Sequence, residues 1–221
     1  MCFSAAASFT ASAVLATIGI INISITRTAR QTMLASIPLW FSIQQAAEGI
    51  VWLTIGNQTS LIFKAAVYLF AGIALCVWPI WIPMSVLKLE TNKIRRKLII
   101  LCTIIGFFVS AYFLITLLYY GSTAKVIAHH IYYHITPLFD YEYVSEHGLI
   151  LYCLATILPF LISSKRGMWL FGILLAISAA SAYFYWYFFF VSIWCFFAAF
   201  LSALLYKVIQ WQNTNRLIFE I

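Results

Sequence analysis

Charged residues are scarce in this chain. Asp, Glu, Lys and Arg together make up 9% of its 221 residues, and only six residues are acidic. A soluble domain carries about a quarter charged residues, which cover its surface with groups that water accepts. Since hydrophobic residues reach 64%, the composition excludes an ordinary soluble protein. We predict that the surrounding medium is lipid and that the bilayer is the first partner of this chain.

The sequence also lacks a cysteine framework and a basic patch. Its five cysteines form no Cys-x-x-Cys pair, and all except Cys2 fall within hydrophobic segments, where a thiol is most simply a small apolar filler. The net charge of +7 comes from cations scattered among short segments. Nucleic-acid binding needs such cations gathered on one exposed face. We therefore expect no disulfide scaffold and no nucleic-acid partner.

Long apolar segments are abundant instead, and most approach the roughly 20 residues that cross a bilayer. They predict an all-α polytopic membrane protein, a single domain over 1–221 with seven transmembrane helices. The fifth span is short, and a turn in Tyr183–Tyr187 is expected to divide the last two. The expected spans are Ala5–Ile25, Leu34–Ile55, Leu61–Met84, Leu98–Tyr119, Gly148–Ile162, Met168–Phe184 and Tyr187–Tyr206.

The positions of the cations predict the orientation. Eleven of the thirteen Lys and Arg residues follow the first, third, fifth or seventh span. Segments rich in Lys and Arg face the cytoplasm. We therefore expect the N-terminus outside and the C-terminus inside.

A polar stripe interrupts the second expected span. Gln44 and Gln45 lie one helical turn before Glu48, so the three side chains share part of a helix face. An ionisable residue within a membrane segment points to a functional site. We therefore expect Glu48 to act as a base or ligand in an outward-facing cavity, with Ser192, Trp194 and Cys195 at a similar depth. The alternative is structural, with Lys64 of the next span pairing with Glu48.

The outer loop, 120–147, holds all four histidines. A Ser/Thr-rich start and Pro137 predict a short interfacial helix over Ser122–Thr136. In a helix, His130 and His134 would project from one face, as paired metal ligands do. His147, Glu146 and Cys2 are further candidate ligands, for Zn or for Cu. The alternative is that these histidines merely suit a headgroup interface.

Three motifs carry a family resemblance. They are the opening Met-Cys-Phe-Ser-Ala followed by Ser8-Phe9, the segment Gln44-Gln45-x-x-Glu48-Gly49, and Trp194-Cys195-Phe196. With them the chain resembles a family of small bacterial multi-pass membrane proteins of unknown function. The resemblance covers most of the chain and singles out Cys2, Gln45, Glu48 and Trp194. It implies a bacterial inner (plasma) membrane location and no particular activity.

Two functional hypotheses follow from the sequence. The first is a metal-assisted enzyme that acts on a lipid or small amphiphile at the Glu48 site. The second is a sensor or binding protein that recognises a metal or small ligand there without chemistry. Transport ranks third, because one buried acid without an inverted repeat is weak support for alternating access. Neither the ligand nor the oligomeric state follows from the sequence.

Overall fold

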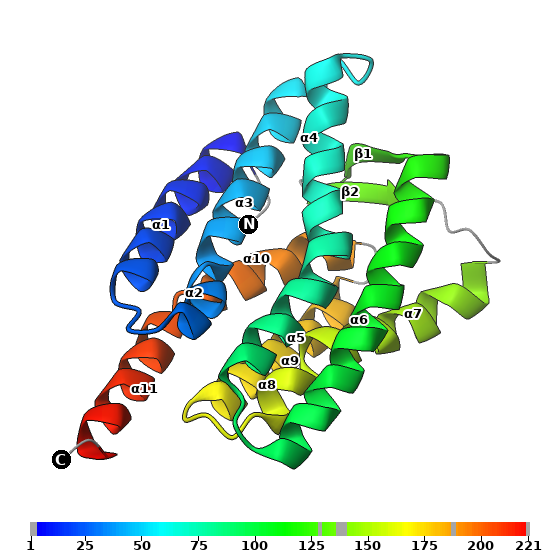
Figure 1. Ribbon diagram of the computed structural model, residues 1–221. Helices are drawn as coiled ribbons and strands as arrows, with labels where there is room; N and C mark the ends of the chain where they lie inside the picture. Colours follow the sequence, from blue (N-terminus) through cyan, green and yellow to red (C-terminus); the bar gives the residue numbers. More distant parts are fainter. Residues whose placement is uncertain (1–3, 128–129, 136–140, 187–188, 220–221) are drawn as a thin grey trace.

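The computed structural model describes residues 4–127, 130–135, 141–186 and 189–219, with side chains for these except 141–147 and 214–219. Helices dominate, and one two-stranded hairpin joins them (Figure 1). The first half comprises α1 (Ala5–Ser24), α2 (Ala29–Ala35), α3 (Ile37–Thr54), α4 (Leu61–Gly72), the π-helix η1 (Ile73–Val77), α5 (Trp78–Leu89) and α6 (Lys93–Tyr120). The second comprises β1 (Ser122–Ile127), β2 (His130–Ile135), α7 (Tyr141–Thr156), α8 (Leu158–Ile162), α9 (Met168–Tyr185), α10 (Phe190–Ser202) and α11 (Leu205–Phe219).

Five helical stretches in the described part of the chain are long and apolar enough to cross a membrane. They are Ala5–Ser24, Leu61–Leu89, Lys93–Tyr120, Met168–Tyr185 and Phe190–Asn213. The second and fifth expected spans, which correspond to α3 and to α7 with α8, do not belong to these five. The count of seven and the orientation therefore stay predictions, whereas the break after Tyr185 divides the last apolar run as expected.

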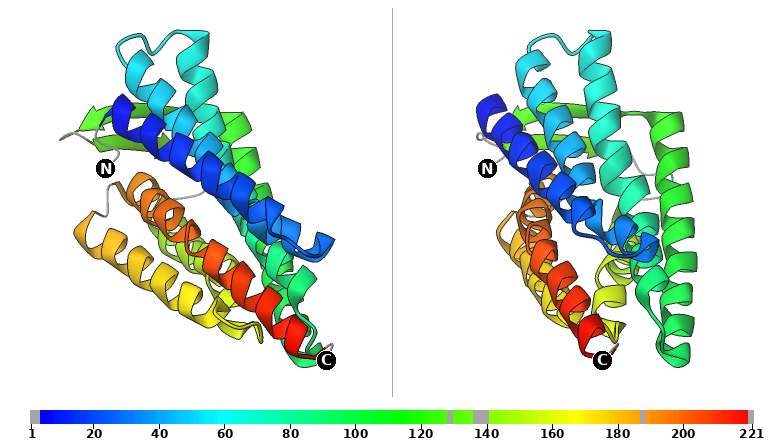
Figure 2. Two further views of the ribbon diagram at one scale, coloured as in Figure 1. Left: turned by 90° about the vertical axis from the view of Figure 1, so that its left-hand side faces the viewer. Right: turned by 60° about the vertical axis from the view of Figure 1, so that its left-hand side comes forward.

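Helix α3 packs along α1, which crosses it on the outside of the bundle (Figure 2). Two serines join the helices reciprocally. Ser12 Oγ donates to the Ser42 carbonyl at 2.8 Å, and Ser42 Oγ donates to the Ser12 carbonyl at 2.8 Å. Nearer the start of α1, the ring of Phe9 lies against Gly49 of α3. A Cβ added to Gly49 would be 2.8 Å from that ring. Small residues at these points allow the two backbones to approach, as in other membrane helix pairs.

The third span contains a π-helical turn, for which Pro79 gives a physical reason. In η1 the Trp78 N–H bonds to the Ile73 carbonyl, five residues back. The same register would pair the Ala74 carbonyl with residue 79, but proline has no N–H. The hydroxyl of Tyr152 on α7 donates to Ala74 instead. Neighbouring α6 fits closely against this turn, because Ser110 Oγ donates to the Cys76 carbonyl at 2.7 Å.

The segment predicted as an interfacial helix is a β-hairpin, so the prediction for Ser122–Thr136 was wrong. Helix α6 ends at Tyr120, and the residue that caps it, Gly121, has a φ of 75°, which is easy only for glycine. The following residues are rich in β-branched and aromatic side chains, which favour strands. Strands β1 and β2 pair antiparallel, with Ala124 opposite Tyr133. Ile131 and Tyr133 are buried on one face, and Tyr133 stacks on Phe70 of α4 with ring centroids 4.2 Å apart.

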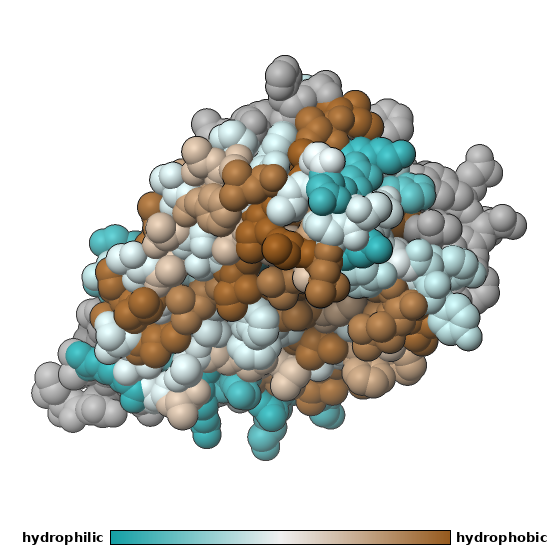
Figure 3. All heavy atoms as spheres, turned by 90° about the horizontal axis from the view of Figure 1, so that it is seen from above, coloured by the Kyte–Doolittle hydropathy of each residue, from teal (hydrophilic) through white to brown (hydrophobic). Residues whose placement is uncertain are grey.

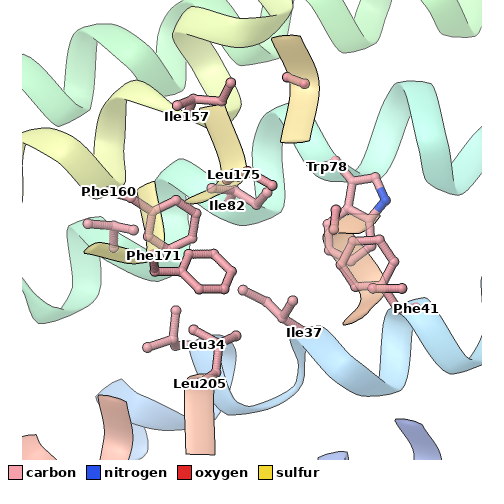
Figure 4. Close-up of a cluster of buried hydrophobic side chains, with 14 of the residues drawn as sticks. Leu34, Ile37, Phe41, Trp78, Ile82, Ile157, Phe160, Phe171, Leu175 and Leu205 are labelled. Atoms are coloured by element: carbon pink, nitrogen blue, oxygen red, sulfur yellow. The ribbon is translucent and has the colours of Figure 1, made fainter. Parts of the chain in front are cut away.

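The main apolar core lies where α2, α3, α5, α8 and α9 meet (Figure 4). Phe160 and Phe171 pack edge to face there, with ring centroids 4.7 Å apart. Phe41 of α3 stacks on Trp78 at 4.1 Å. Many other large apolar side chains remain exposed, including Phe107 and Phe108 on α6. Seen from above, apolar residues lie among polar ones over much of this end of the molecule (Figure 3).

At one end of the bundle, Glu90 joins two connections. Its carboxylate accepts hydrogen bonds from Thr91 N, Asn92 N, Ser163 Oγ, Ser164 N and Ser164 Oγ. Burial raises the pKa of Glu90, but the bonds from Ser164, Asn92 and Ser163 outweigh burial and lower the pKa to about 2. Lys165 Nζ also donates to Thr91 Oγ1 at 3.0 Å. The predicted cytoplasmic connections after the third and fifth spans therefore lie side by side.

Candidate functional site

The polar stripe of α3 is buried inside protein. Gln44, Gln45 and Glu48 are all at most 1% exposed. At 100° per residue these side chains and Trp52 fall within a single arc of about 100° on the helix. That arc is enclosed because α3 contacts α1, α4, η1 and α10. Such enclosure is expected for a carboxylate in a membrane protein, because lipid offers it no hydrogen-bond donor.

Glu48 forms a hydrogen bond with helix α10. Ser192 Oγ on α10 donates to Glu48 Oε1 at 2.7 Å, and both residues are at most 1% exposed. Cys195 lies one turn further along α10, and its thiol is close to the Gln44 side chain. Ser192 and Cys195, two of the three residues expected at the depth of Glu48, therefore lie beside the polar stripe of α3. Side chains 144 residues apart in sequence form one polar contact.

Gln44 connects the acid to the π-helical turn. Trp78, the first residue of α5, donates its indole N–H to Gln44 Oε1 at 3.0 Å. Trp78 in turn lies under Phe41, one turn before Gln44 or Gln45 on the same helix. The bond restricts the Gln44 rotamer, because the side-chain carbonyl accepts from a buried donor. π-helical turns often occur at functional sites, and this one lies beside the acid.

A cavity of about 260 Å³ lies next to the Glu48–Ser192 pair. Ser192, Trp194 and Cys195 of α10 form part of its wall, and nine of its nineteen lining residues are aromatic. The remaining walls come from η1, α6, β2, α7 and α9. The lining residues are Ala74, Leu75, Tyr112, Phe113, Thr116, Ile131, Tyr132, Tyr133, Ile135, Gly148, Leu149, Tyr152, Tyr183, Phe189, Phe190, Val191, Ser192, Trp194 and Cys195.

Several buried donors surround this cavity and the stripe without a hydrogen-bond partner among the described residues. They are Gln44 Nε2, Gln45 Nε2, Trp52 Nε1 and Trp194 Nε1. Buried N–H groups are usually paired with protein or ordered water, because an unmade bond costs about 1–3 kcal/mol. All four can donate, so the surroundings of Glu48 suit a negative charge or a bound acceptor.

Lys64, the predicted structural partner of Glu48, lies elsewhere. It is exposed on α4, whose buried face carries Phe63, Ala66, Val67 and Phe70. Neighbouring Phe63 faces inward, and one residue along a helix turns the side chain by about 100°. The structure therefore does not bring Lys64 and Glu48 together.

The metal candidates are dispersed or undescribed. His130 and His134 belong to β2, where residues four apart share a face but lie about 13 Å apart at 3.3 Å per residue. One ion cannot bind both at about 2 Å. The described residues contain no group of three or more His, Cys, Asp or Glu side chains that could hold a metal. Cys2 and the side chains of Glu146 and His147 lie outside the described set, so the prediction for them stands untested.

Sequence reasoning missed Tyr152 and Trp78, which both contact the π-helical turn and its neighbours. Tyr152 lies in an apolar span, and its hydroxyl needs a buried partner. The signal was Pro79, which leaves a carbonyl free about one turn earlier. Proline alone predicted a kink, but it did not identify the helix that would supply the donor.

An apolar bundle with five helices of membrane-spanning length and a buried acid beside a cavity defines an integral membrane protein of predominantly helical fold. The chain belongs to a family of unknown function (DUF6629), whose model matches residues 1–218. Neither the curated proteins nor the solved structures contain a match to it.

Proposed function

We propose that this membrane protein binds a small amphiphile in the aromatic cavity, with Ser192 and Glu48 as the polar end of the site. The observation that carries the proposal is the 2.7 Å bond between Glu48 and Ser192, because Ser192 also lines the cavity. A ligand in contact with Ser192 would therefore be linked to the buried Glu48 side chain through the Ser192 hydroxyl. Aromatic walls with a few convergent polar groups are typical of small-molecule sites.

The size of the cavity limits the ligand. A dry cavity of about 150 Å³ admits benzene, and this one has about 260 Å³. It therefore suits one ring with a short substituent, or the end of a single chain, rather than a whole phospholipid. In the predicted orientation the cavity lies toward the outer face beside the hairpin, so the protein would act as a receptor or binding protein for compounds that enter from outside.

Filling the cavity tests the proposal. We expect Val191→Phe to abolish the thermal stabilisation that small aromatic amphiphiles give the purified protein in lipid nanodiscs. Val191 lines the cavity, whereas Phe200 on the same helix is 73% exposed. Phe200→Leu is therefore the matched control and should respond like the wild type. Equal stabilisation of Val191→Phe by every compound that stabilises the wild type would refute a ligand site in this cavity.

Hydrolysis is the second candidate function. Ser192 Oγ lies 2.7 Å from the Glu48 carboxylate, which is the contact expected between a nucleophile and its base. In that case Glu48 accepts the serine proton as Ser192 Oγ bonds to the carbonyl carbon of an ester in the cavity. The ester C–O bond then breaks, the alcohol leaves with the proton from Glu48, and water hydrolyses the acyl-serine to the acid and free serine. Glu48→Gln and Ser192→Ala should then abolish turnover of a short aromatic ester while binding persists. If both variants bind the ester and neither they nor the wild type cleave it, the hydrolytic candidate fails.

A metal-assisted version needs ligands beyond those two residues. His130 and His134 lie too far apart to share an ion, so Zn or Cu would depend on His147, Glu146 or Cys2 together with one of them. The proposal of a binding site therefore does not include a metal.

A further inference from the structure

We infer that the ligand carries an uncharged hydrogen-bond acceptor, such as the carbonyl oxygen of a ketone, ester or amide, which accepts from the indole N–H of Trp194. The inference rests on the proposed function, because it specifies the chemical class that the same cavity selects. Three observations lead to it: the position of Trp194, the missing partner of its N–H, and the hydrogen bonds that other donors of the wall already make.

Trp194 lies in the wall of the cavity and is almost completely enclosed. The side chain belongs to α10, lines the cavity and is 6% exposed. Phe190 packs against it with ring centroids 5.2 Å apart, and Tyr152 meets it edge to face at 5.6 Å. Because two rings contact the indole, packing restricts its orientation. A donor on this ring is therefore preorganised, and a ligand does not have to order it.

The indole N–H of Trp194 has no acceptor. Its Nε1 atom is buried and has no hydrogen-bond partner among the described residues. Buried N–H groups are nearly always paired with protein or with ordered water, and an indole nitrogen can only donate. Since Trp194 lines the cavity, a molecule bound there is the natural source of the missing acceptor.

Other donors of the same wall already bond to the protein. Thr116 Oγ1 donates at 2.9 Å to a carbonyl one turn earlier on α6, and the Tyr152 hydroxyl donates to a carbonyl of η1. Ser192 Oγ donates to Glu48 Oε1. In contrast to these three hydroxyls, Trp194 offers the cavity a donor whose hydrogen has no acceptor among the described residues.

A single neutral donor suits an uncharged acceptor. Moving a carbonyl group from water into an apolar site is costly unless it makes a hydrogen bond there, and one N–H supplies that bond. An ionised carboxylate is far more costly to bury and needs more than one neutral donor. A ligand of the same shape without an acceptor would leave the Trp194 N–H unpaired, so the site should discriminate between the two.

A matched pair of probes isolates the acceptor. Acetophenone and α-methylstyrene are both uncharged and nearly identical in shape, but the first has C=O where the second has C=CH2. Binding is measured by isothermal titration calorimetry on the whole protein in lipid nanodiscs, after subtraction of the signal from empty nanodiscs. The quantity compared between proteins is the ratio of the two affinities, because the partition of each probe between water and lipid then cancels.

Trp194→Phe removes the N–H and keeps an aromatic ring. We expect the ratio of acetophenone affinity to α-methylstyrene affinity to fall about tenfold in this variant, because the bond to a buried donor is lost. Trp169→Phe is the matched control, since Trp169 on α9 is 55% exposed and is not among the described residues that line the cavity. The control should keep the wild-type ratio.

A second measurement needs no variant and therefore applies even if Trp194→Phe does not fold. In wild-type protein with isotope-labelled tryptophan, acetophenone should move one indole N–H resonance downfield relative to its position with α-methylstyrene bound. Among the described lining residues Trp194 alone is a tryptophan. The two probes present the same ring to the wall, so the difference between the two spectra reports the hydrogen bond.

The outcomes separate this inference from the proposed function. If both probes bind the wild type and the affinity ratio is the same in Trp194→Phe, the inference is overturned and the amphiphile site stands. Identical indole spectra with the two bound probes would overturn it as well, and would mean that the N–H is paired with water only. If neither probe binds or stabilises the wild type, the inference and the proposed function both fail.

Discussion

Glu48 and Ser192 lie 144 positions apart in the chain and form a buried hydrogen bond of 2.7 Å. The bond joins α3, on the α1 side of the bundle, to α10, on the α9 side. It also gives the cavity its polar end, because Ser192 lines the wall. The packing of α3 with α10 and the polar end of the cavity therefore depend on the same hydrogen bond. Its contribution to the free energy of unfolding and its contribution to ligand binding can be measured separately.

The Glu48–Ser192 bond should show strong energetic coupling. Ser192→Ala removes a donor from a buried carboxylate, and hydrogen bonds to charged groups contribute about 1.5–3 kcal/mol. We expect Ser192→Ala to lower the free energy of unfolding by that amount in wild-type background and by much less in the Glu48→Gln background. A double-mutant cycle of unfolding in mixed detergent micelles measures the difference. Additive effects would show that the bond is energetically unimportant.

Gly106 on α6 should tolerate no side chain. An added Cβ would lie 1.8 Å from the carbonyl oxygen of Pro79, and that oxygen belongs to the backbone of a packed helix. We expect Gly106→Ala to lower the free energy of unfolding by about 3 kcal/mol or more. Gly72→Ala is the control, because nothing lies within 4 Å of its added Cβ. The control should be neutral or stabilised by up to about 1 kcal/mol.

Gly49 should be less sensitive than Gly106. Its added Cβ would be 2.8 Å from the ring of Phe9, which is 37% exposed and can move. We expect Gly49→Ala to cost roughly 1–2 kcal/mol, and Phe9→Leu to restore most of that loss by making room. Thermal unfolding of the two single variants and the double variant measures this. A double variant less stable than either single variant would contradict the steric explanation.

Glu90 should make stability depend on pH. Its pKa is lowered to about 2 in the folded protein from 4.5. A lowered pKa stabilises the fold above the unfolded value, and the contribution disappears as the pH falls through the folded value. Wild type should therefore exceed Glu90→Gln in stability by at most about 3 kcal/mol above pH 5, with the difference vanishing as the pH falls from 4.5 toward 2. Unfolding of both proteins across this range tests it.

The hairpin histidines should not form a metal site together. We expect Zn²⁺ content after equilibration and desalting to be the same in wild type and in the His130→Ala/His134→Ala double variant, since the two side chains are about 13 Å apart along β2. Atomic absorption on the purified proteins measures the content. Loss of one equivalent of zinc in the double variant would mean that these residues bind the ion with other partners.

The pattern of the outer loop was ambiguous for a definite reason. Ile131 and Ile135 are four residues apart, and so are His130 and His134. Four residues return to one side both in a helix, at 3.6 residues per turn, and in a strand, at two. The spacing that suggested a helix therefore fitted β2 equally well. The β-branched and aromatic composition, with Gly121 before it, was the better guide.

The partner of Glu48 could not be predicted from sequence distance. Lys64 is close along the chain, but α4 turns its apolar face inward and leaves Lys64 exposed. That choice follows from the burial of Phe63, Val67 and Phe70, which stabilises α4 against its neighbours more than one ion pair would. The predicted topology did place Glu48 near Ser192 and Cys195, because the second span ends on the side where the seventh begins, and the structure shows Ser192 bonded to Glu48.

By itself the sequence determined that the chain is a helical membrane protein and that Glu48 is buried, because scarce charge and long apolar runs permit few other structures. It also located the break near Tyr185 and the end of α6. Only the tertiary structure decided which donor reaches Glu48, which hydroxyl satisfies the carbonyl of Ala74, and where the aromatic walls enclose a cavity. These depend on how helices distant in sequence rotate and pack, which periodicity along a single segment does not specify.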